Sequence, residues 1–131
     1  MATTDSLVGK HINEADTPAL WIDLDAFENN ALKMLELTKS HQVRWRPHVK
    51  ASKSPELAHR LIALGAEGIT CAKVGEAEAM AAGGIADILI ANEIVGRTKV
   101  QRLVQVAANA RVAVACDHEQ NLRDISSAAS D

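Results

Sequence analysis

The sequence predicts an α/β protein with a parallel sheet. Segments typical of strands and of amphipathic helices alternate along the chain with short connections, which is the pattern of βα units. Two strand segments, residues 87–92 and 111–116, are largely apolar and are expected to be buried on both faces. Periodicity alone leaves a doubly wound sheet and a (β/α) barrel open. A complete (β/α)8 barrel takes about 250 residues, so 131 residues could supply about half of one.

Composition is that of a globular cytoplasmic protein and argues against several kinds of partner. Hydrophobic residues make up 47% of the chain, charged residues 24%, and the net charge is −3. This balance provides no basic surface for nucleic acid or for anionic membranes. The sequence shows no signal peptide and no apolar run of membrane-spanning length. Cys71 and Cys116 lie in apolar runs and are expected to be buried free thiols.

The first residues precede the regular pattern. Residues 1–16 are polar and lack periodicity, so we expect an N-terminal arm followed by one domain over residues 17–131. Residues 19–24 are expected to form a strand. Asp25 followed by Glu28 is a capping-box pattern, which predicts that a helix begins there.

The later elements follow from local signals. Ser54-Pro55-Glu56 combines a capping side chain, a proline at the first helical position and an acid in the first turn. Gly65 is expected to cap the end of that helix. The expected helices are residues 54–64, 75–82, 98–107 and a last one from Asp117, and they alternate with strands at 68–72, 87–92 and 111–116.

Residues 44–50 carry the most distinctive pattern in the chain. Side chains alternate between the two faces of an extended segment, so the basic residues share one face and the apolar ones share the other. The basic face consists of Arg44, Arg46, His48 and Lys50. A solvated edge strand is the alternative interpretation, because Pro47 cannot donate a hydrogen bond to a neighbouring strand.

Lys50 is the main candidate for chemistry. It ends a strand, and the carboxyl ends of parallel strands are where α/β proteins build active sites. Its positive neighbours Arg46 and His48 favour the neutral amine, which could attack a carbonyl group; a surface lysine is the alternative. His48 could act as a base, contact a cofactor or be a hydrogen-bonded core residue. Asn92 could reach the same site or merely close its own strand.

Several blocks of the sequence resemble the fold-type III pyridoxal-phosphate enzymes, whose barrel is of the alanine racemase N-terminal type. Residues 17–30 resemble the opening of these enzymes. Arg46-Pro47-His48-Val49-Lys50 resembles the cofactor-lysine motif of the D-threonine aldolase and D-serine dehydratase branch. Residues 71–78 and 87–93 resemble the next two blocks of that branch. One departure is Ala51-Ser52-Lys53, where members of the branch commonly carry Thr-His-Lys.

The resemblance implies a specific fold. The strand at residues 22–25 would belong with a C-terminal β-domain that this sequence does not contain. The barrel would begin with the lysine strand, and about four of its eight strands would be present, at residues 43–50, 68–72, 87–91 and 111–116. The chain would then be an N-terminal fragment, weakly active or inactive alone, and the full-length form would be a homodimer.

The resemblance also implies a reaction. Lys50 would carry pyridoxal 5'-phosphate as a Schiff base, with Arg46, His48 and Asn92 as further candidates for cofactor binding. The activity would be that of a D-threonine aldolase, the retro-aldol cleavage of a D-3-hydroxy amino acid. The alternatives are a β-elimination like that of D-serine dehydratase, a non-catalytic pyridoxal-phosphate protein, or an inactive fragment. Ligands for a divalent metal and for the cofactor phosphate would lie beyond residue 131.

Overall fold

The computed structural model describes residues 7–130 and contains a parallel sheet of three strands. The strands are β1 (Ile69–Cys71), β2 (Asp87–Glu93) and β3 (Arg111–Ala115), side by side in that order. The helices are η2 (Ile12–Glu14), α1 (Leu24–Ser40), α2 (Pro55–Leu64), α3 (Val74–Ala82), α4 (Arg97–Ala107) and α5 (Glu119–Ser130). The α/β class and the order of elements from residue 54 onward are confirmed.

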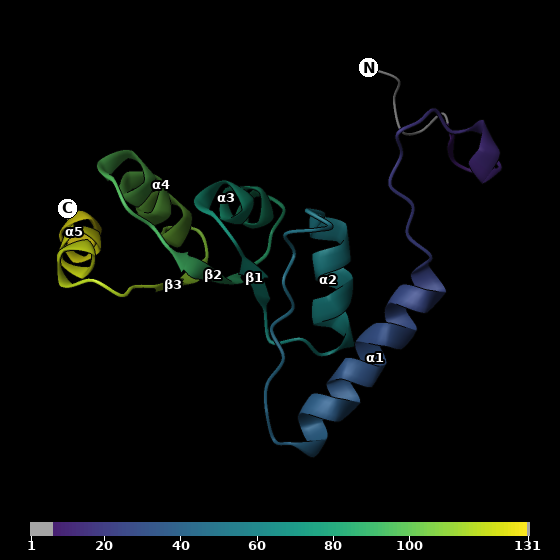
Figure 1. Cartoon of the computed structure of the whole chain (residues 1–131), viewed down its shortest axis with the longest axis horizontal. Helices are drawn as coiled ribbons and strands as arrows, with labels where there is room; N and C mark the ends of the chain where they lie inside the picture. Colours follow the sequence, from purple (N-terminus) through teal and green to yellow (C-terminus); the bar gives the residue numbers. More distant parts are fainter. Residues whose placement is uncertain (1–6, 131) are drawn as a thin grey trace.

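The helices that follow the strands cover one face of the sheet (Figure 1). Ile69, Cys71, Ile88 and Ile90 point to that face, are fully buried and form the core with residues of α3 and α4. The expectation that the second and third strands are buried on both faces is wrong. Burial alternates along β2 and β3, because no helix of the described residues covers the opposite face of these two strands (Figure 1).

The expected strand at residues 19–24 is also wrong. Residues 19–23 have no regular structure, and Leu20 is 75% exposed. A strand needs a neighbour to satisfy its backbone groups, and none of the described strands pairs with this segment. The helix begins at Leu24, and its N-cap is Asp23 rather than Asp25: the Asp23 carboxylate accepts the Ala26 N–H at 2.9 Å. Of the expected arm, residues 1–6 lie outside the described residues.

The segment expected as the first barrel strand, residues 43–50, runs parallel to β1 but pairs with it at a single bridge, between His48 and Thr70. The Val49 N–H donates to the Thr70 carbonyl at 2.9 Å, and the Thr70 N–H donates to the Pro47 carbonyl at 2.7 Å. The preceding bond of a parallel ladder would need an N–H at Pro47, which proline lacks. We call residues 43–50 the lysine segment.

The two cysteines differ in environment. Both are free thiols, as expected, but only Cys71 is buried. Cys116 is exposed because it follows β3, where the sheet has already ended. Burial, with a smaller contribution from the Glu76 carboxylate, raises the pKa of the Cys71 thiol to about 12. Within residues 7–130, no helix has the length and apolar character needed to cross a membrane.

Candidate functional site

We call the face of the sheet that no described helix covers the open face. An ion-pair cluster lies on it, at the amino ends of the strands. Arg46 Nη1 lies 2.7 Å from Asp87 Oδ1, and Arg111 Nη1 lies 3.5 Å from Asp87 Oδ2. Gly68 makes room for this contact, because a Cβ there would lie 2.6 Å from the Asp87 carbonyl oxygen and against the Arg46 guanidinium. Arg46 is therefore fixed by Asp87 where β2 begins, four residues before Lys50.

The middle of the open face is less polar. His48 bridges Thr70, and Thr70 is in register with Leu89 of β2. The Thr70 hydroxyl donates to the Arg46 carbonyl at 3.0 Å, and the residue is only 7% exposed. The exposed ring of His48 accepts the Lys50 N–H on Nδ1 at 3.2 Å. A ring that accepts on Nδ1 carries its proton on Nε2 when it is neutral, so this contact fixes the His48 tautomer.

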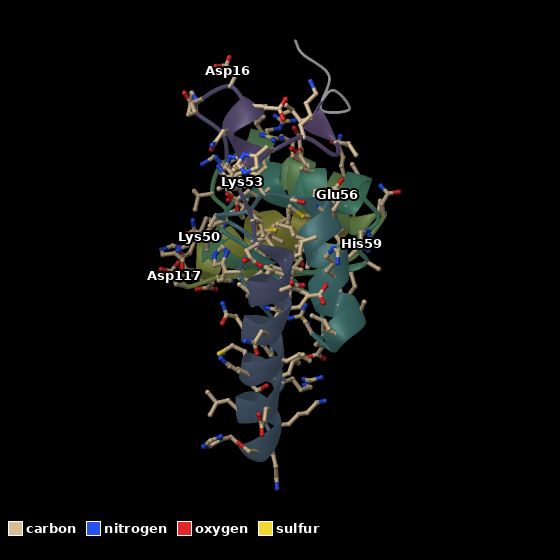
Figure 2. All side chains as sticks on the ribbon, turned by 90° about the vertical axis from the view of Figure 1, so that its right-hand side faces the viewer. Asp16, Lys50, Lys53, Glu56, His59 and Asp117 are labelled. Carbon is tan, nitrogen blue, oxygen red and sulfur yellow. The ribbon has the colours of Figure 1, made fainter. Side chains whose placement is uncertain are left out.

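Lys50 stands at the carboxyl end of the lysine segment, where the chain turns away from the sheet. Val49 is 1% exposed and anchors the segment in the core, whereas the Lys50 side chain is exposed. The Lys53 N–H donates to the Val49 carbonyl at 2.8 Å and closes the turn; Lys53 adopts a positive φ of 49°. Figure 2 shows Lys50 and Lys53 on one side of the molecule, with His59 of α2 on the other.

Ala72, the residue after β1, is hydrogen-bonded to one residue of β2 and one residue of α3. The Asn92 amide donates to the Ala72 carbonyl at 3.0 Å, and its oxygen accepts the Glu93 N–H at 3.1 Å. On its other side, the Ala72 N–H donates to Glu76 Oε2 at 2.7 Å. Ala72 lies two residues beyond Thr70, the residue that bridges His48 of the lysine segment. Lys50 and Asn92 thus lie toward the carboxyl ends of the strands, and His48 lies opposite Thr70 in the middle. Arg46 lies toward the amino end of β2, beside Asp87.

Glu76 is the residue of this edge that sequence reasoning missed. It is 7% exposed and is the third residue of α3. A signal was present, since Glu at this helical position often reaches back to a backbone N–H ahead of the helix. The sequence does not reveal that the Glu76 carboxylate accepts the N–H of Ala72, beside the lysine segment.

The Lys50 side chain is exposed near the carboxyl end of β1. A lysine amine can form a Schiff base with a carbonyl compound. Among residues 7–130, no three His, Cys, Asp or Glu side chains are grouped so that they could hold a metal ion.

Comparison with known proteins gives a consistent family match. The family described as "Alanine racemase, N-terminal domain" matches residues 22–131. A D-threonine aldolase of an Arthrobacter species is 46% identical over 120 residues, which is 92% of this chain and 32% of that protein. The chain therefore spans about a third of the length of this curated relative.

Two solved structures resemble the chain closely. The crystal structure of D-threonine aldolase from Filomicrobium marinum superposes with a TM-score of 0.85 at 51% identity, covering 89% of this chain and 32% of that one. A D-threo-3-hydroxyaspartate dehydratase from Delftia sp. HT23 superposes with a TM-score of 0.78 at 34% identity, covering 87% and 30%.

Proposed function

Because the chain belongs to the alanine racemase N-terminal domain family, we propose that it forms part of a pyridoxal-phosphate-dependent lyase of the D-threonine aldolase type. The reaction is the cleavage of the Cα–Cβ bond of a D-3-hydroxy amino acid. The observation that carries the proposal is the exposed Lys50 at the carboxyl end of the lysine segment, beside the sheet. A solved structure that is 51% identical to the chain is that of a D-threonine aldolase.

We assign the sheet to a (β/α)8 barrel. Such a barrel has helices on the outer face of its sheet and layers of side chains on the inner face. The register of β1, β2 and β3 aligns side chains across the sheet as such layers require. The lysine segment then serves as the first barrel strand, although Pro47 limits its pairing. In this proposal residues 17–131 are the amino-terminal part of the barrel domain and residues 1–16 are an arm.

Lys50 is the residue that would hold the cofactor, through its side-chain amine. When bound, pyridoxal phosphate supplies an electron sink for the bond that is broken at Cα. The position of Lys50 fits such a group, since its side chain is exposed and its backbone N–H bonds to His48 Nδ1 instead of to β1. His48 orients the lysine backbone through Nδ1, and Asn92 fixes the neighbouring strand end.

Arg46 has a different role in this proposal. Its guanidinium is bound by Asp87 at the amino end of the sheet, so we assign it to the stability of the barrel base and not to the cofactor. The proposed reaction would use a metal to polarise the β-hydroxyl, and no three His, Cys, Asp or Glu side chains of residues 7–130 are grouped to hold one.

A chimera tests the activity, because this chain matches about a third of the Arthrobacter D-threonine aldolase. The matched third of that enzyme is replaced by this chain, and the chimera is supplied with pyridoxal phosphate, a divalent metal and D-threonine. We expect glycine and acetaldehyde, and loss of both with Lys50→Ala. A folded, cofactor-loaded chimera that forms neither product would contradict the proposal and favour a non-catalytic cofactor protein.

A dehydratase is the second candidate, since the Delftia enzyme shares the fold with a TM-score of 0.78. It would release water from the β-carbon and yield a 2-oxo acid and ammonia. The same chimera, offered D-serine and a D-3-hydroxyaspartate, separates the two reactions by their products. Ammonia from these substrates without aldehyde from D-threonine would favour the dehydratase.

A further inference from the structure

The hydrogen-bond ladder between the lysine segment and β1 stops abruptly at Thr70. Thr70 donates to the Pro47 carbonyl and accepts from the Val49 N–H. In a parallel ladder the next bond would run from the Ala72 N–H to the Val49 carbonyl. Both groups are instead bonded elsewhere, so the strand pair ends one residue before Lys50.

Two contacts replace the missing bond. The Ala72 N–H donates to Glu76 Oε2 at 2.7 Å, and the Val49 carbonyl accepts the Lys53 N–H at 2.8 Å. Buried backbone groups need partners, and these two contacts satisfy both without joining the strands. With these two contacts in place of the ladder bond, Lys50 is not paired with β1 and lies in a turn.

Glu76 is well placed to hold the Ala72 N–H. It is 7% exposed and belongs to the first turn of α3, where the helix dipole favours a negative charge. A buried carboxylate is costly unless it is hydrogen-bonded, and the Ala72 N–H supplies such a bond. The Asn92 amide holds the carbonyl of the same residue at 3.0 Å, so side chains bind both backbone groups of Ala72.

We propose that Glu76 is a positioning residue for Lys50. By accepting the Ala72 N–H it ends the ladder and maintains the Val49–Lys53 turn, which keeps the Lys50 amine clear of the sheet and available to the cofactor aldehyde. This inference rests on the proposed function of Lys50. If Glu76 served only to cap α3, its removal would leave the turn and the reactivity of Lys50 unchanged.

Hydrogen exchange tests the turn without any cofactor. Glu76→Met fills the buried volume but offers no oxygen to the Ala72 N–H, which can then bond to Val49 and displace the Lys53 N–H. We expect the Lys53 amide to exchange about tenfold faster in this variant, as expected for a lost hydrogen bond. Glu76→Gln retains an acceptor oxygen and should stay within about twofold of the unmodified chain.

Cofactor labelling tests the consequence for Lys50. The chain is incubated with pyridoxal phosphate and reduced with borohydride, and the pyridoxyl label is mapped. We expect the share of label on Lys50, relative to Lys53 and Lys73, to fall about fivefold or more in Glu76→Met and to recover in Glu76→Gln. Glu78→Met is the matched control, since Glu78 lies on α3 but bonds Arg102; it should alter neither readout.

Unchanged Lys53 exchange in Glu76→Met, or an unchanged Lys50 share, would overturn the inference. Glu76→Ala is a second variant that removes the same acceptor and must agree with Glu76→Met. If the unmodified chain takes no label on Lys50, that result contradicts the proposed function of Lys50, whatever the role of Glu76. The exchange result then decides separately whether Glu76 maintains the turn.

Discussion

Arg46 and Asp87 form a 2.7 Å hydrogen-bonded ion pair between the lysine segment and the first residue of β2. Both side chains are largely covered, at 21% and 26% exposure. Arg111 approaches the same carboxylate at 3.5 Å but is 81% exposed. The two arginines therefore contact one acid in very different environments, and only one of the contacts is protected from solvent.

We expect Asp87→Ala to destabilise the chain by about 1–3 kcal/mol, because it leaves the largely covered Arg46 charge with only its 4.0 Å contact to Glu67. Arg111→Ala removes an exposed contact and should cost less than about 0.5 kcal/mol. Urea unfolding of both variants measures the difference. Equal losses for the two variants would mean that the covered position of the Arg46 pair adds nothing to stability.

Stability should also decline in acid. The Arg102 hydrogen bond lowers the pKa of the Glu78 carboxyl, and the Ser54 hydroxyl lowers that of Glu56. A carboxyl whose pKa is lower in the folded chain stabilises it above the ordinary Glu value of about 4.3. That contribution is lost as the pH falls through the lowered pKa.

The measurement is the unfolding free energy across this pH range for the unmodified chain and for Glu78→Gln. The variant should show a shallower acid decline, and the difference should shrink in high salt, since the Glu78–Arg102 pair lies at the surface. A Glu78→Gln curve parallel to that of the unmodified chain would contradict this account.

The two thiols should differ in reactivity. The thiolate is the reactive form, and the pKa of Cys71 is raised to about 12 in the core, whereas Cys116 is exposed. Iodoacetamide at neutral pH should therefore modify Cys116 and spare Cys71 until denaturant is added. Modification of Cys71 at the same rate as Cys116 in the folded chain would show that the core around β1 opens.

Local signals in the sequence predicted the elements that depend only on neighbouring residues. The start of α2 is an example: the Ser54 hydroxyl accepts the Leu57 N–H at 3.2 Å, and Pro55 is the first helical residue. The strand expected at residues 19–24 failed for the opposite reason. A strand depends on a partner that may be distant in sequence, and local composition does not report whether one is present.

The sequence predicted those features of the candidate site that depend on local pattern, and missed those that depend on distant residues. The parity of residues 44–50 correctly placed Lys50 and His48 on the open side, because alternation is a local property. It also placed Arg46 on that side, but it could not show that Asp87, 41 residues away in sequence, binds Arg46 at the amino end of β2. The contact between Glu76 and Ala72 is local, since it spans four residues, and the position of Glu76 in the first turn of a helix could have indicated it.

The central claim is that Lys50 is the residue that holds pyridoxal phosphate. Borohydride reduction of the chain with the cofactor, followed by peptide mapping, tests it directly, with Lys50→Arg and Lys53→Arg as paired variants. We expect the label on Lys50 in preference to Lys53 and Lys73, its loss in Lys50→Arg and its retention in Lys53→Arg. Label spread evenly over the exposed lysines, or an equal yield from Lys50→Arg, would contradict the claim.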